Sequence, residues 1–425
     1  MRICLYAIGC RLNTAEIDSL ARQFTAIGHS VVSSGSDADI VIFNSCAVTR
    51  SAGSESRRII RKLRREHPYA TLVVTGCYAE IDMHIARNIG ADLLIGTQYK
   101  DDIPQILTEV GLLHASDCIA TDMICASSSS GRTRAFLKVQ DGCENRCTFC
   151  VVTIARGSGR SKKIGQVIQE INDLVGLGYC EVVLCGVHLG AYGHDIGVDV
   201  CLEDMVTAVL QETDIQRLRL SSLEPWDLTP NFFRLWEDAR ILPHLHLPLQ
   251  SGCDRTLRRM GRRNTSNGFQ NLLESARISI PDLSVTTDVI VGFPGETDTD
   301  FFESIEFIDN MKFARLHIFP YSGRPGTAAS KMSDQISVDV IQNRSRLMHE
   351  ISKNRQEQFV GNFVGRELDV LWESYKSYDD LVCWSGFTSN YLRAYAYTDA
   401  DRALRNVITK TKMLETYREG LLCHV

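Results

Sequence analysis

Short apolar runs alternate with helical patterns over roughly the first 125 residues of the chain. Three of these runs each lead into a cysteine, and they cover residues 3–8, 40–43 and 72–74. The cysteines that follow them are Cys10, Cys46 and Cys77. Continuous apolar runs of this length are typical of strands buried on both faces of a parallel sheet. Because the carboxyl ends of such strands gather along one edge, where open α/β sheets bind ligands, we expect the three cysteines to converge.

A strand and helix alternation repeats about six times further along the chain. The predicted strands cover residues 135–139, 181–185, 217–220, 244–249, 284–291 and 314–319. Six βα units predict a parallel barrel that falls short of the full eight and stays open on one side. Residues 126–131 include four consecutive serines without periodicity, which predicts a linker before this barrel.

Polar residues fall on consistent sides of the predicted barrel strands. In HLHLPLQ, residues 244–250, a period of two puts the leucines on one face and the polar residues His244, His246 and Gln250 on the other. The leucines are expected to meet the outer helices, and the polar face is expected to line the barrel. Asp288 lies within a strand, and Glu224 follows one. A carboxylate in such a setting is costly unless it is paired, so we expect a partner or a ligand for each.

The pattern changes after a long predicted helix at residues 338–359. Short strands rich in aromatic residues follow at residues 367–372, 381–386 and 392–397, which predicts a small antiparallel β-barrel. The fold class is therefore α/β with three parts. We expect a parallel-sheet α/β domain at 1–125, a partial (β/α)6 barrel at 132–360 and the small β-barrel at 361–425.

The amino-acid composition indicates the cellular compartment and the use of the cysteines. No stretch of the 425 residues approaches the roughly 18 apolar residues of a membrane span, so a cytoplasmic protein without membrane contact is expected. In a reducing compartment, 15 cysteines argue against a disulfide framework and favour metal ligands together with ordinary buried thiols. The cysteines expected to be buried thiols are Cys4, Cys118, Cys125, Cys180, Cys185, Cys201, Cys253, Cys383 and Cys423.

Charge is unevenly distributed, although the net charge of −6 does not indicate a nucleic-acid partner. One predicted helix carries Arg57, Arg58, Arg61, Lys62, Arg64 and Arg65. A second carries Arg255, Arg258, Arg259, Arg262 and Arg263. A single run of this kind is more often a solvated face, but the two together make a polyanionic partner plausible.

Cys143, Cys147 and Cys150 lie in one loop just after the first barrel strand, at the carboxyl end where barrel chemistry is placed. A loop with this spacing can wrap three corners of a four-iron, four-sulfur cluster, whose ligands are thiolates. A zinc site is the alternative, but structural zinc normally takes four protein ligands in paired short spacings. The iron–sulfur cluster is favoured because its fourth iron would be open to a small chelating ligand.

This three-cysteine motif on a partial barrel resembles the radical S-adenosylmethionine (SAM) superfamily. The resemblance extends over essentially the whole chain to its methylthiotransferase family. GCRLN at 9–13, NSCAVT at 44–49 and VTGCYAE at 74–80 are similar to the three cysteine motifs of that family. The segments similar to its radical domain are 142–157, 246–252 and 288–296, and the tail resembles its TRAM β-barrel. GVHLGAYG at 186–193 is most similar to the MtaB-type branch, which modifies N6-threonylcarbamoyladenosine (t6A) next to the tRNA anticodon.

The resemblance implies two [4Fe-4S] clusters and two SAM molecules. Cys143, Cys147 and Cys150 would hold the cluster at which one SAM is cleaved to a radical that removes hydrogen from C2 of the adenine. The second cluster would carry the sulfur that the other SAM methylates, and its ligands would be Cys10, Cys46 and Cys77. Buried core thiols are the alternative reading of this second trio. The implied partners are tRNA, a flavodoxin- or ferredoxin-like electron donor and an unidentified sulfur donor.

Further side chains are candidates for cofactor or substrate contacts. The candidates for SAM are Phe149, Gly186, His188, Glu224, Gln250 and Asp288. Arg156 and Arg160 are candidates for a substrate carboxylate or phosphate, with a solvated glycine-rich loop as the alternative. Trp384 is a candidate for stacking on RNA, although a place in the β-barrel core is the favoured reading.

The leading hypothesis is an enzyme that converts t6A in tRNA to its 2-methylthio derivative. Two competitors share the chemistry but act on isopentenyladenosine in tRNA or on an aspartate of a ribosomal protein. A competitor of another class is a non-catalytic iron–sulfur or zinc module that binds RNA.

Overall fold

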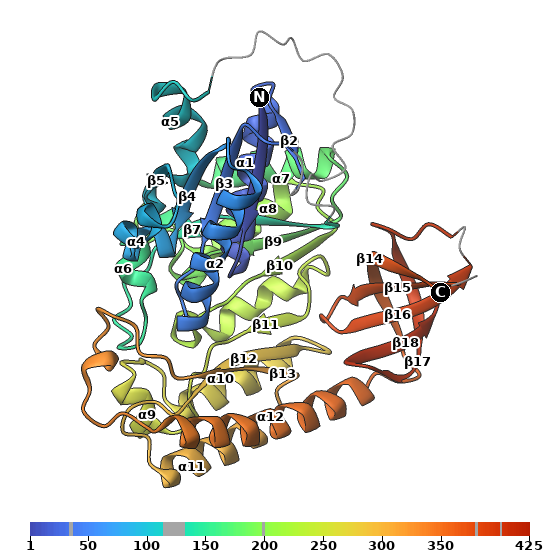
Figure 1. The fold of residues 1–425 in the computed structure, drawn as a ribbon. Helices are drawn as coiled ribbons and strands as arrows, with labels where there is room; N and C mark the ends of the chain where they lie inside the picture. Colours follow the sequence, from blue (N-terminus) through green and yellow to red (C-terminus); the bar gives the residue numbers. More distant parts are fainter. Residues whose placement is uncertain (34–36, 114–131, 198–199, 379–380, 400–401) are drawn as a thin grey trace.

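The computed structural model describes residues 1–33, 37–113, 132–197, 200–378, 381–399 and 402–425. In Figure 1 an N-terminal sheet with its helices lies next to a central set of parallel strands. A small β-barrel beside these strands carries the C-terminus. The linker expected at 126–131 lies outside the described residues. The boundaries 1–125, 132–360 and 361–425 therefore stay a prediction.

The N-terminal part is a five-stranded parallel sheet with the order β2-β1-β3-β4-β5. Its strands are β1 (Arg2–Ala7), β2 (Ser30–Val32), β3 (Ile40–Ser45), β4 (Thr71–Gly76) and β5 (Leu93–Ile95). Its helices are α1 (Arg11–Ala26), α2 (Arg50–Glu66), α3 (Cys77–Ile81), α4 (Met83–Asn88) and α5 (Ile103–Glu109). Alternate residues of β3 enter separate cores, with Ile42 on one face and Phe43 on the other. The three strands expected to precede Cys10, Cys46 and Cys77 are thus confirmed. Because both faces of the sheet are buried, apolar and polar residues do not alternate along these strands.

The central part is an open parallel barrel of six strands. They are β6 (Arg134–Lys138), β9 (Glu181–Cys185), β10 (Arg217–Leu220), β11 (His244–His246), β12 (Ser284–Val291) and β13 (Arg315–Pro320). Two three-stranded sheets, β6-β9-β10 and β11-β12-β13, meet through the pairing of Ser222 with His246. Strand β11 ends before the expected residue 249, because Pro248 has no N–H to give to a ladder.

Outer helices cover the barrel. They are α7 (Ile164–Gly176), α8 (Leu202–Glu212), α10 (Ser266–Ser279), α11 (Asp298–Asn310) and the long α12 (Val338–Gly361). Leu245, Leu247 and Leu249 are fully buried in the core that also contains Phe269 and Leu273 of α10. The expected division of this segment, with leucines toward the helices, is confirmed. No helix in the described part of the chain is long and apolar enough to cross a membrane.

Helix α1 of the N-terminal part lies against the open barrel. Its Leu12 packs with Val183 and Cys185 of β9 and with Phe136 of β6. These strand residues alternate with Val182, Leu184 and Leu137, which belong to the core shared with the helices. The side chain of Leu12 therefore fills the inward face of the barrel from its open side.

A buried set of charges joins the same two parts. Glu16 of α1 accepts hydrogen bonds from Lys100 at 2.6 Å and from Arg156 at 2.9 Å. Arg156 also donates to Asp141 at 2.9 Å and to Asn13 at 2.8 Å. Burial raises the pKa of Glu16, but the opposing effect of Lys100 and Arg156 is larger and holds it well below its usual range. The carboxylate is charged and fully paired, as burial requires.

The C-terminal part is a closed five-stranded barrel with the order β14-β15-β16-β18-β17. Its strands are β14 (Glu367–Tyr378), β15 (Leu381–Thr388), β16 (Arg393–Asp399), β17 (Ile408–Tyr417) and β18 (Gly420–His424). All neighbouring strands pair antiparallel except β16 and β18, which pair parallel and close the barrel. The expected small barrel is confirmed, with two strands, β17 and β18, beyond the three anticipated.

The loop after β15 returns to the central barrel. The ring of Tyr391 lies 4.6 Å from that of His244, measured between centroids. Its hydroxyl accepts hydrogen bonds from Arg11 at 2.9 Å and from Arg134 at 3.2 Å. One tyrosine of the small barrel thus contacts both other parts of the chain.

We expect Glu16→Gln to lower the free energy of unfolding by about 3 to 5 kcal/mol, because it leaves buried Lys100 and Arg156 without their shared anion. Urea denaturation at neutral pH measures this loss. Asp18→Asn is the matched control on the same helix. Its partner Arg132 has a half-exposed side chain, so a loss within about 1 kcal/mol is expected.

The pH dependence gives a second measure of the Glu16 variant. Because the folded-state pKa of Glu16 lies below its unfolded value, its contribution is present above the unfolded pKa of about 4.3 and is lost as the pH falls. The difference in stability between wild type and Glu16→Gln should therefore shrink on acidification. A difference that stays constant from neutral pH down to pH 3 contradicts this assignment.

Candidate metal and cofactor site

The cysteines that follow β1, β3 and β4 lie together at one edge of the N-terminal sheet. Cys10 precedes the first turn of α1, Cys46 follows β3, and Cys77 opens α3. A methyl group added at Gly9 would lie 2.7 Å from the sulfur of Cys46, so the first two loops are in contact. Burial, with the nearby thiols of Cys10 and Cys77, raises the pKa of Cys46 to about 11.

The backbone around this trio is tightly fitted. Gly76 has a φ of +96°, and a Cβ there would lie 2.3 Å from the carbonyl oxygen of Ser45. The amide of Asn13 donates to the carbonyl oxygens of Ile8 at 2.7 Å and Ser45 at 3.1 Å. The three cysteine loops are thus fixed to one another by backbone contacts that do not involve the sulfur atoms.

The second trio lies in the loop between β7 (Gln140–Asp141) and α6 (Val152–Arg156). Each sulfur accepts one N–H donor. The donors are Asn145 N to Cys143 at 3.4 Å, Arg262 Nη1 to Cys147 at 3.8 Å and Val152 N to Cys150 at 3.4 Å. Hydrogen bonds to sulfur are a feature of iron–sulfur ligation. Burial, with the neighbouring thiols, raises the pKa of Cys150 to about 12, so a metal must displace a proton there.

The spacing of the sulfur atoms bears on which metal group fits. A tetrahedral zinc with Zn–S bonds of about 2.3 Å brings its sulfurs within about 4 Å of each other. Neither cysteine trio is among the described groups whose ligand atoms all lie within 4.8 Å of one another. In each trio at least one pair of sulfurs is therefore farther apart than a single tetrahedral zinc would hold them, and thiolates are the ligands that iron–sulfur clusters use.

The two trios flank one interface. Helix α6 begins two residues after Cys150 and contacts α3, which begins with Cys77. The hydroxyl of Thr97 donates to the carbonyl oxygen of Ala155 in α6 at 2.6 Å. Arg156, the last residue of α6, reaches Asn13 and Glu16 of α1. The edge that carries the first trio and the loop that carries the second therefore face each other across α6.

His188 lies close to the second trio. Its imidazole donates to Asp227 at 2.6 Å, and its backbone N–H donates to Gln140 at 2.8 Å. Burial lowers the pKa of His188, but Asp227 and Cys143 more than offset this and raise it to about 10. A Cβ at Gly186 would lie 3.0 Å from the oxygen of Gln140, so a larger residue there would press on this arrangement.

Glu224, for which we expected a partner or a ligand, is paired with an arginine. Both of its carboxylate oxygens accept from Arg262, at 3.0 and 2.6 Å. Arg262 also donates to the carbonyl of Pro248 at 2.6 Å and lies 4.4 Å from the ring centre of Trp226. The sequence showed Arg262 only as one member of a basic run, and nothing local to it signals that it meets Cys147.

Asp288 is also paired, by two histidines. His246 and His317 lie 3.3 and 3.2 Å from the same carboxylate oxygen. Thr286 hydrogen-bonds to His246 at 2.9 Å and to His244 at 3.2 Å, which extends a polar chain along the inward face. His317 was not a sequence candidate, although its register opposite Asp288 on β13 places it on the same side.

The remaining SAM candidates occupy two kinds of surroundings. Phe149 is half-buried in an apolar cluster with Met260 and Phe293, the latter edge-on at 6.4 Å. Gln250 is buried, has a φ of +73° and exchanges backbone hydrogen bonds with β12. A left-handed backbone at a residue other than glycine marks a constrained position, which is common near ligand sites.

Two of the three expected substrate contacts require correction. Arg156 is 3% exposed and binds carboxylates of the chain itself, so it is not available to a substrate. Arg160 is exposed and donates to the carbonyls of Arg156 and Ser158, so its contact with a substrate stays a prediction. Trp384 is 3% exposed within the core of the small barrel, where it cannot stack on a base. The sequence around Arg156 could not show that its partner Glu16 lies far away along the chain, and the sequence around Trp384 could not show that the ring is buried.

Three of the five arginines in the second run form ion pairs within the chain. Arg255 pairs with Asp300 and Glu303, Arg259 with Asp334, and Arg262 with Glu224. Arg258 and Arg263 of the same run are exposed and form no ion pair in the described ranges. The expectation of a polyanionic partner for this run therefore stays a prediction.

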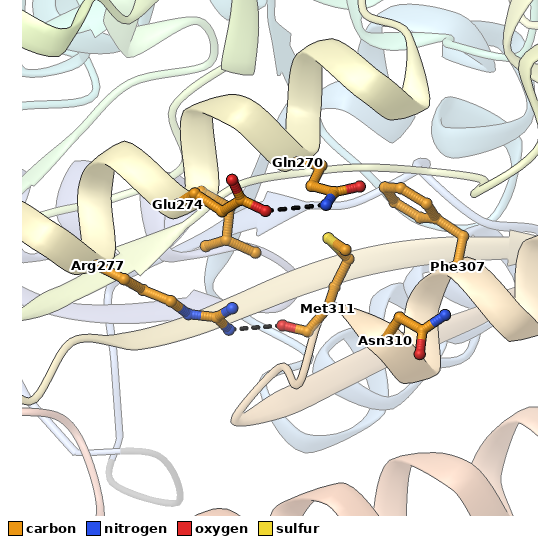
Figure 2. Close-up of a pocket in the computed structure, with 7 residues that line it drawn as sticks. Gln270, Glu274, Arg277, Phe307, Asn310 and Met311 are labelled. Carbon is orange, nitrogen blue, oxygen red and sulfur yellow. Dashed lines mark hydrogen bonds between the residues drawn. The ribbon is translucent and has the colours of Figure 1, made fainter.

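A surface hollow of about 270 Å³ lies on the outer helices, away from both trios. Figure 2 shows a hydrogen bond between Gln270 and Glu274 along its rim and another from Arg277 to the carbonyl of Met311. None of the candidate site residues lines it. It belongs to the contact between α10 and the end of α11 and carries no part of the predicted chemistry.

Two family models match the chain. The model described as "Uncharacterized protein family UPF0004" matches residues 2–96, and the Radical SAM superfamily model matches residues 137–308. The first covers the first cysteine trio, and the second covers the other.

Relatives match along most of the chain. A threonylcarbamoyladenosine tRNA methylthiotransferase MtaB of Bacillus subtilis (strain 168) is 32% identical, covering 100% of this chain and 96% of the relative. A tRNA-2-methylthio-N(6)-dimethylallyladenosine synthase of Thermobifida fusca (strain YX) is 32% identical over 85% of this chain and 76% of that relative. A solved radical SAM methyltransferase, TsrM of Kitasatospora setae, is 13% identical with a TM-score of 0.56, covering 75% and 72%. The last shows a shared fold only.

Gly76→Ala is expected to disrupt the first trio, because its Cβ would collide with the Ser45 carbonyl in a backbone conformation that alanine rarely adopts. Iron bound per chain after anaerobic reconstitution should fall by about half. Gly111→Ala is the matched control, since Gly111 also has a positive φ of +75° but has no atom within 4 Å of the added Cβ. It should keep the wild-type iron content, and equal iron in the two variants would contradict the fit described.

Proposed function

Because this chain belongs to the radical SAM methylthiotransferase family, we propose that it converts t6A next to the tRNA anticodon to its 2-methylthio derivative (ms2t6A). The observation that carries the proposal is the 32% identity along the full chain to a threonylcarbamoyladenosine tRNA methylthiotransferase. The cofactors of this radical SAM enzyme are SAM and [4Fe-4S] clusters. Two all-cysteine trios on facing edges are consistent with two clusters.

We assign one cluster to each trio. Cys143, Cys147 and Cys150 hold the cluster that binds SAM, and the second cluster is held by Cys10, Cys46 and Cys77. When bound, these groups supply the radical chemistry that an unactivated aromatic C–H requires. The domains follow this division, with residues 1–125 for the second cluster, 132–360 for the SAM-binding cluster and 361–425 as a TRAM-like barrel.

Other side chains of this protein surround the cluster cysteines and the inward face of the barrel. Arg262 and the backbone N–H of Asn145 donate to sulfurs of the SAM-binding trio. Burial raises the pKa of the Cys147 thiol, and Arg262 opposes this rise. Leu12 covers the inward-facing side chains of Val183 and Cys185 in β9 and of Phe136 in β6. The SAM contacts are assigned to the side of the barrel near this trio, to Phe149, Gly186, His188, Glu224 and Gln250. Asp288 acts there through the histidines it positions.

The inward face of the barrel favours t6A over dimethylallyladenosine. The threonylcarbamoyl group presents carbonyl and carboxylate oxygens, whereas a dimethylallyl group is a hydrocarbon. His317, with a side chain 41% exposed beside Asp288, offers a ring N–H to such oxygens. A site built from hydrogen-bonding groups discriminates strongly against a substrate that lacks the matching atoms, because its polar groups are then left unpaired.

The cluster assignment predicts the iron content of variants. Anaerobically reconstituted wild type should bind about eight iron atoms per chain. Replacing Cys10, Cys46 and Cys77 together by alanine should leave about four and preserve reductive cleavage of SAM. Cys4→Ala is the control, because this buried thiol belongs to the sheet core and should leave about eight. Wild type that binds about four iron atoms, or zinc, would refute the two-cluster assignment.

The substrate assignment is tested with purified tRNA carrying either t6A or dimethylallyladenosine. We expect the reconstituted enzyme with SAM and reductant to form the methylthio nucleoside only from t6A, as read by nucleoside mass spectrometry. His317→Leu should lower kcat/KM for t6A by about 10- to 100-fold, the cost of one lost polar contact. Methylthiolation of dimethylallyladenosine by wild type, with t6A left unchanged, would overturn the assignment.

A further inference from the structure

Helix α2 concentrates positive charge on one exposed face. It carries seven basic residues against two acidic ones in a chain whose net charge is −6. Ile59, Ile60 and Leu63 form its buried side, so the basic residues project from the opposite side. This distribution is the reverse of the rest of the protein, and solubility alone does not call for it.

The basic residues of α2 follow the helical repeat. Arg50, Arg57, Arg61 and Arg65 are spaced by seven, four and four residues, which aligns them along the axis. The stripe extends over about 22 Å at 1.5 Å per residue. Guanidinium groups along such a length can contact several consecutive phosphates of a nucleic-acid strand.

The charges on α2 are only partly neutralised within the chain. Arg58 pairs with Glu55, and Arg64 pairs with Asp92. Arg61 and Arg65 are exposed and form no ion pair with any residue in the described ranges. In the run on and after α9 (Asp254–Arg259), Arg255, Arg259 and Arg262 are held by carboxylates, whereas Arg258 and Arg263 are exposed and form no ion pair in the described ranges.

A hollow of about 440 Å³ lies on the same face. Its lining consists of Ser54, Arg58, Arg61, Arg64, Arg65 and Ile89. Arg58 and Arg64 already have carboxylate partners, so Arg61 and Arg65 carry the uncompensated charge of this concavity, and an anion between them would lower their repulsion. A phosphate group matches both the charge and the bidentate geometry of arginine.

Helix α2 is directly connected to the first cysteine trio. The hydroxyl of Ser56 donates to the carbonyl of Cys46 at 2.8 Å and accepts from its N–H at 3.1 Å. The guanidinium of Arg57 lies 5.9 Å from the ring centre of Tyr78, the neighbour of Cys77. At its start, Arg50 donates from its backbone N–H to Ser322, in the segment after β13. The row of arginines along α2 is therefore next to the first cysteine trio at one point and extends away from it along the helix.

We propose that the exposed face of α2, formed by Arg57, Arg58, Arg61, Arg64 and Arg65, binds the phosphate backbone of the tRNA anticodon stem and orients the target nucleotide. The proposal rests on the proposed function for the identity of the RNA. The contact is electrostatic, reads no base and is independent of the t6A modification. It makes the N-terminal part a tRNA-binding element in addition to a cluster carrier.

The test measures binding of the reconstituted enzyme to an anticodon stem-loop by fluorescence anisotropy between 50 and 300 mM KCl. Arg61→Gln together with Arg65→Gln should weaken Kd about tenfold at 100 mM KCl. The slope of log K against log salt should fall by about 1.5, because two phosphate contacts are removed. Arg346→Gln with Lys353→Gln on α12 is the matched control, since both are exposed, and it should leave Kd and slope unchanged.

Two stem-loops, with and without t6A, separate this proposal from the substrate assignment. Both should lose affinity equally in the α2 variant, whatever nucleoside the enzyme modifies. Iron content equal to that of wild type shows that the variant folds. A Kd within twofold of wild type and an unchanged salt slope would overturn the α2 proposal, even if the enzyme methylthiolates t6A.

Discussion

The buried pairing of Arg156 with Glu16 holds the functional arrangement together. Arg156 ends the short helix that follows the SAM-binding cysteines, and Glu16 lies in the helix that follows Cys10. Lys100, Asp141 and Asn13 complete the set. Buried ion pairs contribute little net stability compared with apolar packing, but they tolerate few alternative geometries. In this protein they fix two cysteine trios on facing sides of one interface.

The central barrel depends on its neighbours for closure. Its inward face carries charged and polar residues, including Glu181 between Arg217 and Arg219. Leu12 of the N-terminal part covers the open side, and Tyr391 of the small barrel contacts His244 in the interior. A barrel with six strands cannot fill its own centre with its own side chains as a closed one does. The flanking parts are therefore structural components of the site.

Much of the fold could be predicted from periodicity. The bounds of β12 were predicted to the residue, and the predicted apolar run at 40–43 covers β3 except for its last two residues, Asn44 and Ser45. Strand β17 was missed because its inward positions include Thr411, which weakens the alternation of apolar and polar residues. Trp384 shows the same limit, since an aromatic ring in a small barrel suits the core and a binding face equally well until burial is known.

Local spacing in the sequence was enough to predict most of the strands, the three kinds of fold and the two cysteine trios. The sequence did not show which arginines form ion pairs within the chain and which stay exposed. Two arginine runs look alike along the chain, yet Arg262 of one is buried against Glu224 and the sulfur of Cys147, whereas Arg61 and Arg65 of the other are exposed and form no ion pair in the described ranges. This difference follows from the fold, because the partner of a long cationic side chain depends on which remote residues the fold brings within a few ångströms.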